Sequence, residues 1–220
     1  MYIPPAFKDT ELSSIHATMR GARLANFVTC TANGLVCTPL PLFLDEREGE
    51  QGVIYGHLAR ANTQWKETPT CDALAIFNGP DAYVTPSWYE SKKEHGKVVP
   101  TWTYVMVHAH GTLEAMATEA ELLSHLTQLT NQNEEEREKP WAVSDAPEKY
   151  IQAMTRGIVG LRMKVERLEG SWKLNQHKSE GDRLSVLTGL SVEADADAKS
   201  VSALMRELEN ARAPAVGVSK

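Results

Sequence analysis

The sequence has few of the features that would place it in a secreted or membrane class. Only three of its 220 residues are cysteine, and none forms a C-x-x-C pair, so a disulfide framework is not indicated. No run approaches the roughly 20 apolar residues that cross a bilayer. The opening Met-Tyr-Ile-Pro-Pro lacks the basic and apolar regions of a signal peptide. These absences predict a cytoplasmic protein without membrane contact.

Several motifs that identify common enzyme classes are also missing. The chain contains no G-x-G-x-x-G, no G-x-x-x-x-G-K-[ST] and no G-x-S-x-G, which argues against a Rossmann site, a P-loop and a hydrolase nucleophile. We assign no catalytic residue. Twenty-three Lys and Arg against 29 Asp and Glu give a net charge of -6. Contact with nucleic acid would therefore need a local basic patch.

The hydrophobic pattern of the first half predicts antiparallel sheet. With 42% hydrophobic and 24% charged residues, the composition is that of a globular protein. A helix is expected from Asp9 or Thr10 to Gly21, and Asn33-Gly34 is a strong hairpin signal that would place Cys30 opposite Cys37. Strands are predicted at 24–31, 35–44, 53–58, 73–77 and 82–85, with Asn78-Gly79-Pro80 as a turn and 90–96 as a charged, mobile segment.

The second half combines strands with helices. A long strand is expected over 98–116, and Thr118 with Glu121 forms a capping box that opens a helix with Leu122, Leu123, Leu126 and Leu129 on its apolar face. A second helix starts near Pro147, with Tyr150, Ile151 and Met154 inward. Alternation over 158–166 indicates a strand with Val159, Leu161, Met163 and Val165 on one face. The tail predicts a helix around Val201 and Met205, then a loose end at 214–220.

The sequence gives only weak support for two further sites, a metal site and a reactive thiol. His108 and His110 share a strand face, as a metal site requires, and Glu114 follows them. The glycines and the later histidine of a cupin metal motif are missing, so we assign no metal. Cys71 has no histidine near it in sequence, and we interpret it as a small buried thiol.

Three stretches combine anion donors with aromatic rings. His57, Arg60 and Asn62 directly follow a predicted strand, where such donors can converge on an anion. Two later stretches pair hydroxyls with tryptophan and add a lysine: Thr85, Ser87, Trp88, Lys97, Thr101 and Trp102. Hydroxyls and cations can hold a phosphate while rings border a planar ligand. The alternative, aromatics as barrel core and cations as solvated rim, remains equally open from the residues alone.

At these residues the sequence resembles the PaiB family of FMN-binding negative transcriptional regulators. The matching stretches are Tyr2-Ile3-Pro4-Pro5-Ala6-Phe7, His57 to Trp65, Ala75 to Pro80 through Trp88-Tyr89, Lys97 to His108, and Lys173-Leu174-Asn175-Gln176-His177-Lys178. They cover roughly positions 1 to 190. Departures from the family pattern include Thr63, Thr103, Asn175 and His177.

The resemblance implies a fold, a cofactor and a set of contacts. The fold would be α+β, an antiparallel split β-barrel of the FMN-binding type with peripheral helices, at residues 1–190, followed by a helical tail at 191–220. The protein would be a homodimer with FMN near the subunit interface. Arg60, Asn62 and Lys97 would contact the phosphate or ribityl chain, assisted by Thr85, Ser87 and Thr101. His57 would orient the loop, and Trp88 and Trp102 would border the isoalloxazine ring.

The family's name implies a regulator that responds to FMN, and two alternatives from other classes stay open. The chain shows no recognisable helix-turn-helix, and its basic groups, Lys92-Lys93 and the set Arg162, Lys164 and Arg167, are small. Direct DNA binding is therefore poorly supported, and an indirect regulatory partner is the other reading. The alternatives are a flavin-dependent oxidoreductase, suggested by the wider superfamily, and a haem-binding split barrel with His57, His108, His110 or His177 as axial ligand.

Overall fold

The structure, a computed structural model, describes residues 1–67 and 69–212 and has an α+β architecture. In that part of the chain one sheet has the strand order β3-β2-β6-β7-β8-β5-β4, and β1 pairs with β8. The strands are β1 (Lys8–Asp9), β2 (Leu24–Thr31), β3 (Gly34–Pro41), β4 (Phe43–Asp45), β5 (Val53–Ala59), β6 (Ala73–Val84), β7 (Thr101–Ala115) and β8 (Ile158–Lys173). The α-helices are α1 (Leu12–Gly21), α2 (Ser91–His95), α3 (Glu119–Glu134), α4 (Glu148–Thr155), α5 (Glu180–Ser191) and α6 (Ala196–Arg212).

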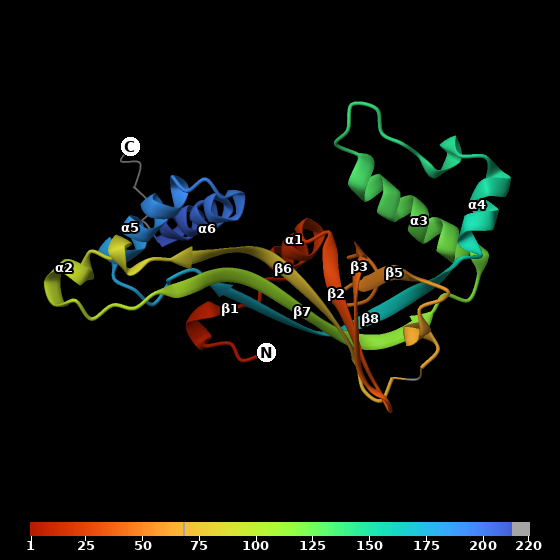
Figure 1. The fold of residues 1–220 in the computed structure, drawn as a ribbon, viewed down its shortest axis with the longest axis horizontal. Helices are drawn as coiled ribbons and strands as arrows, with labels where there is room; N and C mark the ends of the chain where they lie inside the picture. The colour runs from red at the N-terminus through yellow and green to blue at the C-terminus, as the bar shows by residue number, and fades with distance from the viewer. Residues whose placement is uncertain (68, 213–220) are drawn as a thin grey trace, which may run out of the picture. The chain divides into compact units, whose positions relative to one another are not determined.

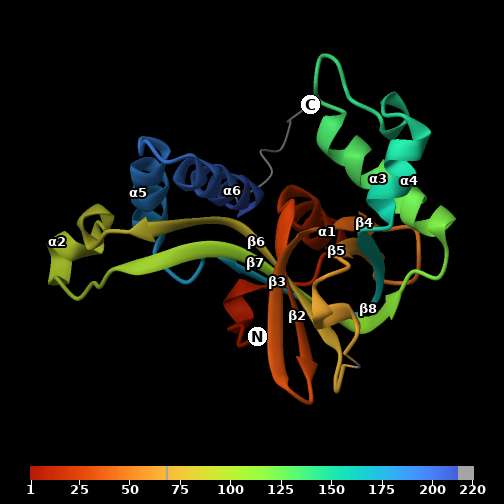
Figure 2. The same cartoon turned by 45° about the vertical axis from the view of Figure 1, so that its right-hand side comes forward.

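The chain divides into two compact units, which are described separately. Unit 1 comprises residues 1–9, 79–106 and 170–220, and unit 2 comprises residues 10–78 and 107–169. Strands β6, β7 and β8 each contribute residues to both units. Figure 1 shows β6 and β7 running alongside each other from the turn that carries α2, and Figure 2 confirms this from a second direction. No helix in the described residues is long and apolar enough to span a membrane.

The first hairpin of unit 2 forms as predicted, but its turn lies one residue earlier, so each residue of β2 pairs two residues away from its expected partner. Thr31 pairs with Gly34, Cys30 with Leu35 and Val28 with Cys37, so the expected pairing of Cys30 with Cys37 is wrong. The Thr31 hydroxyl accepts from the Asn33 amide at 3.1 Å and donates to the Gly34 carbonyl at 3.2 Å. These two bonds move the turn to Ala32-Asn33.

The core of unit 2 follows the alternation of its strands. Val159, Leu161, Met163 and Val165 of β8 are all buried, which confirms the predicted apolar face of this strand. The capping box of α3 is formed: Thr118 accepts from the Glu121 amide, and Glu121 accepts from the Thr118 amide. In α4, Tyr150 and Met154 are more than half exposed, so the predicted inward face of that helix is wrong.

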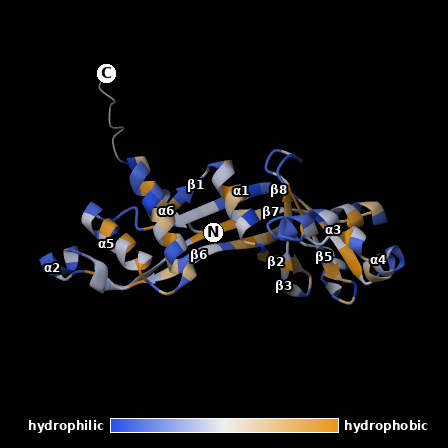
Figure 3. Ribbon diagram, turned by 90° about the horizontal axis from the view of Figure 1, so that it is seen from above, coloured by the Kyte–Doolittle hydropathy of each residue, from blue (hydrophilic) through white to orange (hydrophobic). Residues whose placement is uncertain are grey.

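Unit 1 has its own apolar core between its strands and the two last helices. Residues of β6 and β7 pack with α5 and α6 around fully buried members that include Val84, Val186, Leu190, Val201 and Met205. Ser202 donates to the Leu187 carbonyl at 2.8 Å, and α5 and α6 lie side by side in Figure 1. Figure 3 shows hydrophobic and hydrophilic residues along α6, as an amphipathic helix requires. The helix expected at the C-terminal end is therefore docked within this unit, and positions 214–220 lie outside the described residues.

Two segments that were expected to form a turn and a mobile loop instead form part of a strand and a helix. Strand β6 continues through Asn78-Gly79-Pro80, because Gly79 serves close packing rather than a turn: a Cβ there would lie 3.0 Å from the Cβ of Val105. The charged segment at 90–96 contains α2, which Gly96 ends in a left-handed conformation (φ 66°).

Candidate functional site

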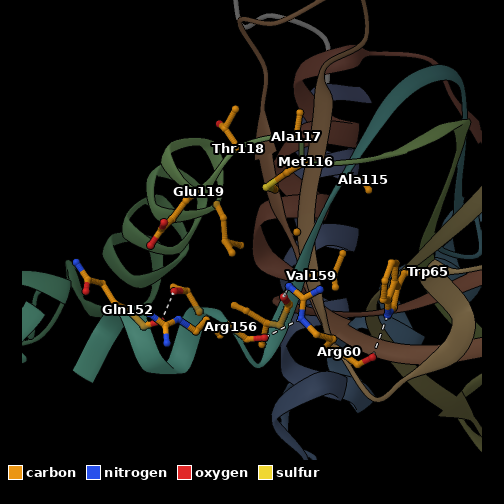
Figure 4. A pocket seen from close by; sticks show the side chains of 14 residues that line it. Arg60, Trp65, Ala115, Met116, Ala117, Thr118, Glu119, Gln152, Arg156 and Val159 are labelled. Carbon is orange, nitrogen blue, oxygen red and sulfur yellow. Dashed lines mark hydrogen bonds between the residues drawn. The ribbon is translucent and has the colours of Figure 1, made fainter. Parts of the chain in front are cut away.

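Unit 2 contains a pocket of about 570 Å³ at the end of β5 (Figure 4). Arg60 and Trp65 line it from one side, Met116 and Thr118 from another, and Arg156 from the region after α4. The two arginines outnumber the carboxylate of Glu119 in the lining, and Trp65 offers a planar ring. The volume falls within the range of about 300–1,000 Å³ typical of small-molecule sites. The pocket can therefore hold an anionic ligand with a planar part.

The backbone of the neighbouring strand orients the guanidinium of Arg60. Its Nε donates to the Arg156 carbonyl at 2.7 Å, and its Nη2 donates to the Ile158 carbonyl at 2.9 Å. The indole nitrogen of Trp65 donates to the Arg60 carbonyl at 3.1 Å, and its ring centroid lies 5.9 Å from the guanidinium carbon (Figure 4). These contacts leave Nη1 of Arg60 available to a ligand.

Asn62 shapes the loop that follows Arg60. Its Oδ1 accepts from the Gln64 amide at 2.9 Å and caps the 3-10 helix at Thr63–Trp65, while its Nδ2 donates to the Thr38 hydroxyl at 3.2 Å. Gln64 is buried, and its side chain bonds to Thr29, Val36 and Thr38 of the β2–β3 hairpin. The polar residues after β5 therefore form a hydrogen-bonded loop that holds Arg60 and Trp65 in place.

His57 of β5 contacts a histidine of α3. Its Nδ1 lies 3.1 Å from Nε2 of His125, and the ring of Tyr55 stacks on His125 at 6.4 Å between centroids. Burial lowers the pKa of His57. Burial, followed by the neighbouring His57, lowers the pKa of His125 to about 4, so both imidazoles are neutral at pH 7. Sequence spacing could not indicate this pair, because its members lie in different elements.

The predicted residues Thr85, Ser87 and Trp88 lie in unit 1, at a short 3-10 helix (Pro86–Trp88) after β6. The Thr85 hydroxyl accepts from the Ser87 amide at 3.3 Å, and the Ser87 hydroxyl accepts from Nζ of Lys92 at 3.4 Å. Trp88 packs on α5, where a Cβ at Gly189 would lie 2.5 Å from its ring. Trp88 thus contributes to the core of unit 1.

Lys97, Thr101 and Trp102 also belong to unit 1, where their surroundings differ. Lys97 is exposed, and the Thr101 hydroxyl accepts from Nζ of Lys173 at 2.9 Å. Trp102 is 55% exposed and meets Tyr83, which is 49% exposed, edge to face at 6.0 Å. The structure therefore assigns His57, Arg60 and Asn62 to unit 2 and the other six predicted contacts to unit 1.

The two strand histidines lie beside the carboxylate of Glu169, although Glu114 is nearer to them in sequence. His110 Nε2 lies 3.2 Å and His108 Nδ1 lies 3.8 Å from Oε2 of Glu169. Glu114 instead contacts Arg162, at 3.4 Å. The ligand-type atoms of His108, His110 and Glu169 lie within 4.8 Å of one another, and Arg167 also pairs with Glu169.

The cysteines of unit 2 do not match their predicted environment. Cys71 is exposed, so the expectation of a buried thiol is wrong. Desolvation, and then the neighbouring Cys30, raise the pKa of the Cys71 thiol. A raised thiol pKa reduces the thiolate population on which nucleophilic attack depends.

Sequence reasoning missed two residues that line the pocket in unit 2. Arg156 follows α4, and Trp65 ends the loop after β5. Trp65 belongs to a stretch that matched the family pattern, so that stretch signalled it. Arg156 reaches the pocket only because β5 and β8 pair, with Ala59 opposite Ile158.

Comparison with known proteins finds a matching family and a relative that matches most of the chain. Residues 1–167 match a family described as an FMN-binding domain. A relative of nearly the same length is "Protease synthase and sporulation protein PAI 2" of Bacillus subtilis, which is 33% identical over 208 residues, 94% of this chain and 97% of its own.

Solved structures with the same fold have far lower sequence identity. A conserved hypothetical protein of Mycobacterium tuberculosis superposes with a TM-score of 0.55 at 12% identity, covering 82% of this chain and 95% of its own. An FAD and heme binding protein of Mycobacterium smegmatis superposes with a TM-score of 0.54 at 13% identity, covering 76% of this chain and 73% of its own. These likenesses support the fold, an antiparallel split barrel with peripheral helices.

Proposed function

Because the chain belongs to the family of FMN-binding domains, we propose that it is a cytoplasmic, homodimeric, flavin-dependent negative regulator of transcription. The observation that supports the flavin site is that Arg60 and Arg156 both line the pocket of unit 2. The regulatory role is supported by the likeness to PAI 2 over nearly the full length of both chains.

The donor chemistry of this pocket fits the phosphate end of FMN. Guanidinium groups recognise phosphate through paired N–H donors, and Arg60 keeps Nη1 after its two backbone bonds. The side chain of Arg156 is exposed and can approach the same anion. FMN, when bound, supplies the redox chemistry of its isoalloxazine ring. The chain's own task is to bind the flavin, orient it and control its access to water.

The remaining predicted contacts lie in unit 1, and Lys97 and Trp102 among them are exposed. In a homodimer these residues can come from either chain, so one flavin can take its phosphate donors from one copy and other contacts from the second. The exposed pair Tyr83 and Trp102 offers ring surface for such a contact. Sedimentation at micromolar concentration tests the dimer: a mass near twice 24.3 kDa supports it, and a mass near 24.3 kDa contradicts it.

We propose that regulation is indirect, through a protein or metabolite partner rather than an operator. The largest basic group in the sequence is largely neutralised by carboxylates: Arg162 pairs with Glu48 and Glu114, and Arg167 pairs with Glu169. The net charge of -6 repels DNA as well. A gel shift at physiological salt with sequence-selective binding would contradict this part of the proposal.

The flavin site is tested by an absorption spectrum of the purified protein, taken before and after incubation with FMN and desalting. We expect retained FMN, and its loss in Arg60→Ala and in Arg156→Met. Arg60→Lys keeps the charge but loses the two backbone bonds, and should show intermediate retention. Arg206→Ala, on the exposed face of α6, is the matched control and should retain FMN fully.

Other spectroscopic or kinetic results would indicate a different function. A Soret band lost on replacement of one histidine would indicate haem binding. Oxidation of a nicotinamide nucleotide by the FMN-loaded protein with multiple turnovers would indicate an oxidoreductase. A protein that stays colourless after incubation with FMN would contradict flavin binding.

A further inference from the structure

Unit 1 contains a second pocket, of about 420 Å³, made only from its own residues. Its lining joins the first residues of the chain to the start of β7 and to the segment that follows β8. Two lysines, Lys173 and Lys178, and the Thr101 hydroxyl supply its donors, and Phe7, Val99 and Pro100 supply apolar surface. The pocket combines positive charge with an apolar wall.

The ammonium groups at this pocket lack carboxylate partners. Nζ of Lys173 donates to the Thr101 hydroxyl at 2.9 Å and lies 5.6 Å from the ring centroid of Tyr104. Nζ of Lys178 lies 4.9 Å from the ring centroid of Tyr89. Among the described residues, neither lysine has a carboxylate within salt-bridge distance. Burial lowers the pKa of Lys173, as expected where no anion compensates the charge.

One acidic side chain that interacts electrostatically with Lys178, that of Asp182, is engaged elsewhere. Asp182 is 4% exposed, and its carboxylate accepts from the amide and the hydroxyl of Ser91 at 3.0 and 2.8 Å. The Asp182 carboxylate lies outside salt-bridge distance of Lys178. The hydrogen bonds from Ser91, and then the charge of Lys178, help to lower the pKa of Asp182. Neither lysine is neutralised by direct pairing within the protein, and an anion in the pocket would gain from both.

The apolar side of the pocket includes a contact between two aromatic rings. The ring of His177 meets the ring of Phe7 edge to face at 5.3 Å and an interplanar angle of 72°. Burial, followed by the two lysines, lowers the pKa of His177, so its imidazole adds a neutral hydrogen-bonding group rather than a third cation. Val99 and Pro100 are next to Thr101 in the chain and extend the apolar surface toward the donors.

We propose that this pocket binds a small organic anion, a phosphate or carboxylate group attached to an apolar body about the size of one ring. The anion would contact Lys173, Lys178 and the Thr101 hydroxyl, and the apolar body would pack on Phe7, Val99 and Pro100. Charge and apolar contact are both needed, because two lysines alone would bind any anion weakly in water. This site is separate from the arginine pocket of unit 2. It assigns Thr101, which the family resemblance predicts as a flavin contact, to this anion instead.

Calorimetry on the full-length protein as purified tests this site with phenyl phosphate and benzoate as probes. Inorganic phosphate, which lacks the apolar body, and benzyl alcohol, which lacks the charge, are the matched controls. We expect at least one of the two probes to bind at least tenfold more tightly than both controls, and the stronger of the two identifies the anionic group. Binding of neither probe above the controls overturns the proposal.

Charge-removing variants then locate the site. Lys173→Met and Lys178→Met should each weaken binding of the stronger probe at least tenfold, whereas Lys199→Met, an exposed lysine of α6, should leave it unchanged. Thermal denaturation of each variant verifies folding. Unchanged probe binding in both pocket variants overturns the proposal.

FMN retention measured on the same variants separates this site from the flavin site. We expect Lys173→Met and Lys178→Met to retain FMN as the unmodified protein does. Loss of FMN in either folded variant would mean that the pocket belongs to the flavin, and would overturn the separate site while leaving the proposed function intact. Loss of FMN only in the Arg60 and Arg156 variants supports two independent sites.

Discussion

The imidazoles of His57 and His125 share a hydrogen bond of 3.1 Å between Nδ1 and Nε2, which joins β5 to α3 just before the arginine pocket. Nδ1 of His125 is buried and has no hydrogen-bond partner among the described residues. One N–H between the two facing nitrogens makes this bond, and a proton added to the second facing nitrogen would place two N–H donors against each other. The pair therefore favours the neutral state.

Acidification should destabilise the protein through this pair. The pKa of His125 is about 4 in the folded protein against an ordinary value of 6.5, so the unfolded chain binds more protons between these values. Stability contributed by the neutral histidine is complete above about pH 6.5 and is lost as the pH falls toward 4, by up to about 3 kcal/mol. Urea unfolding at a series of pH values measures the change. His125→Gln, which keeps a hydrogen-bonding group toward His57, should flatten the profile, and an equally steep profile in that variant would contradict the assignment.

Gly111 of β7 should tolerate no side chain. A Cβ at this position would lie 1.9 Å from the carbonyl oxygen of Lys164, and a backbone atom cannot move away as a flexible side chain can. We expect Gly111→Ala to lower the free energy of unfolding by about 2 kcal/mol or more. Gly21→Ala, which meets nothing within 4 Å, is the control. Equal denaturation midpoints for the two variants would refute the close approach of β7 to β8.

Gln64 should be essential to the loop that carries Arg60. Its Oε1 accepts from the Thr38 hydroxyl at 2.6 Å, and its Nε2 donates to the Thr29 hydroxyl at 3.1 Å and the Val36 carbonyl at 3.3 Å. Gln64→Met preserves the shape and removes these three bonds, at a cost of about 1–3 kcal/mol. Gln128→Met, which removes a surface bond to Ser124, should cost much less. Chemical denaturation compares the two, and FMN retention should fall only in the Gln64 variant.

The last helix should contribute strongly to the stability of unit 1. Met205 of α6 is 2% exposed within the core of that unit, and its truncation leaves a cavity. We expect Met205→Ala to lower the free energy of unfolding by about 2–5 kcal/mol. Met154→Ala, at a position 51% exposed in α4, should change it little. Similar values for both variants would show that α6 does not dock as described.

The hairpin shows where short-range signals stop being sufficient. The Asn33-Gly34 dipeptide correctly indicated two paired strands, β2 and β3. A type I′ turn, a common form at an Asn-Gly pair, needs positive φ at both central residues. Gly34 has a φ of 111°, but Asn33 is not among the non-glycine residues with positive φ, of which Asn175 is the only one described. The Thr31 hydroxyl bonds moved the turn by one residue, and such a slip changes every cross-strand pair.

The sequence pattern correctly predicted structural features that depend on a single segment. The capping box of α3 depends on residues three apart, and the buried face of β8 depends on a period of two. Both formed as predicted, as did the terminal helix around Val201 and Met205. The family and its FMN-binding domain also followed from the sequence, because the matching stretches are long and specific.

Tertiary structure alone decided which distant groups meet. Arg156 joins Arg60 because β5 pairs with β8, His125 faces His57 because α3 packs on β5, and Lys173 meets Thr101 across 72 residues of sequence. Likewise, Gly79 lies within a continuous strand because Val105 packs against it. Local residue preferences carry no information on such encounters, since they are set by the packing of segments far apart in the chain. The sequence by itself determined the family, the main elements and their buried faces, and tertiary packing determined the composition of both pockets.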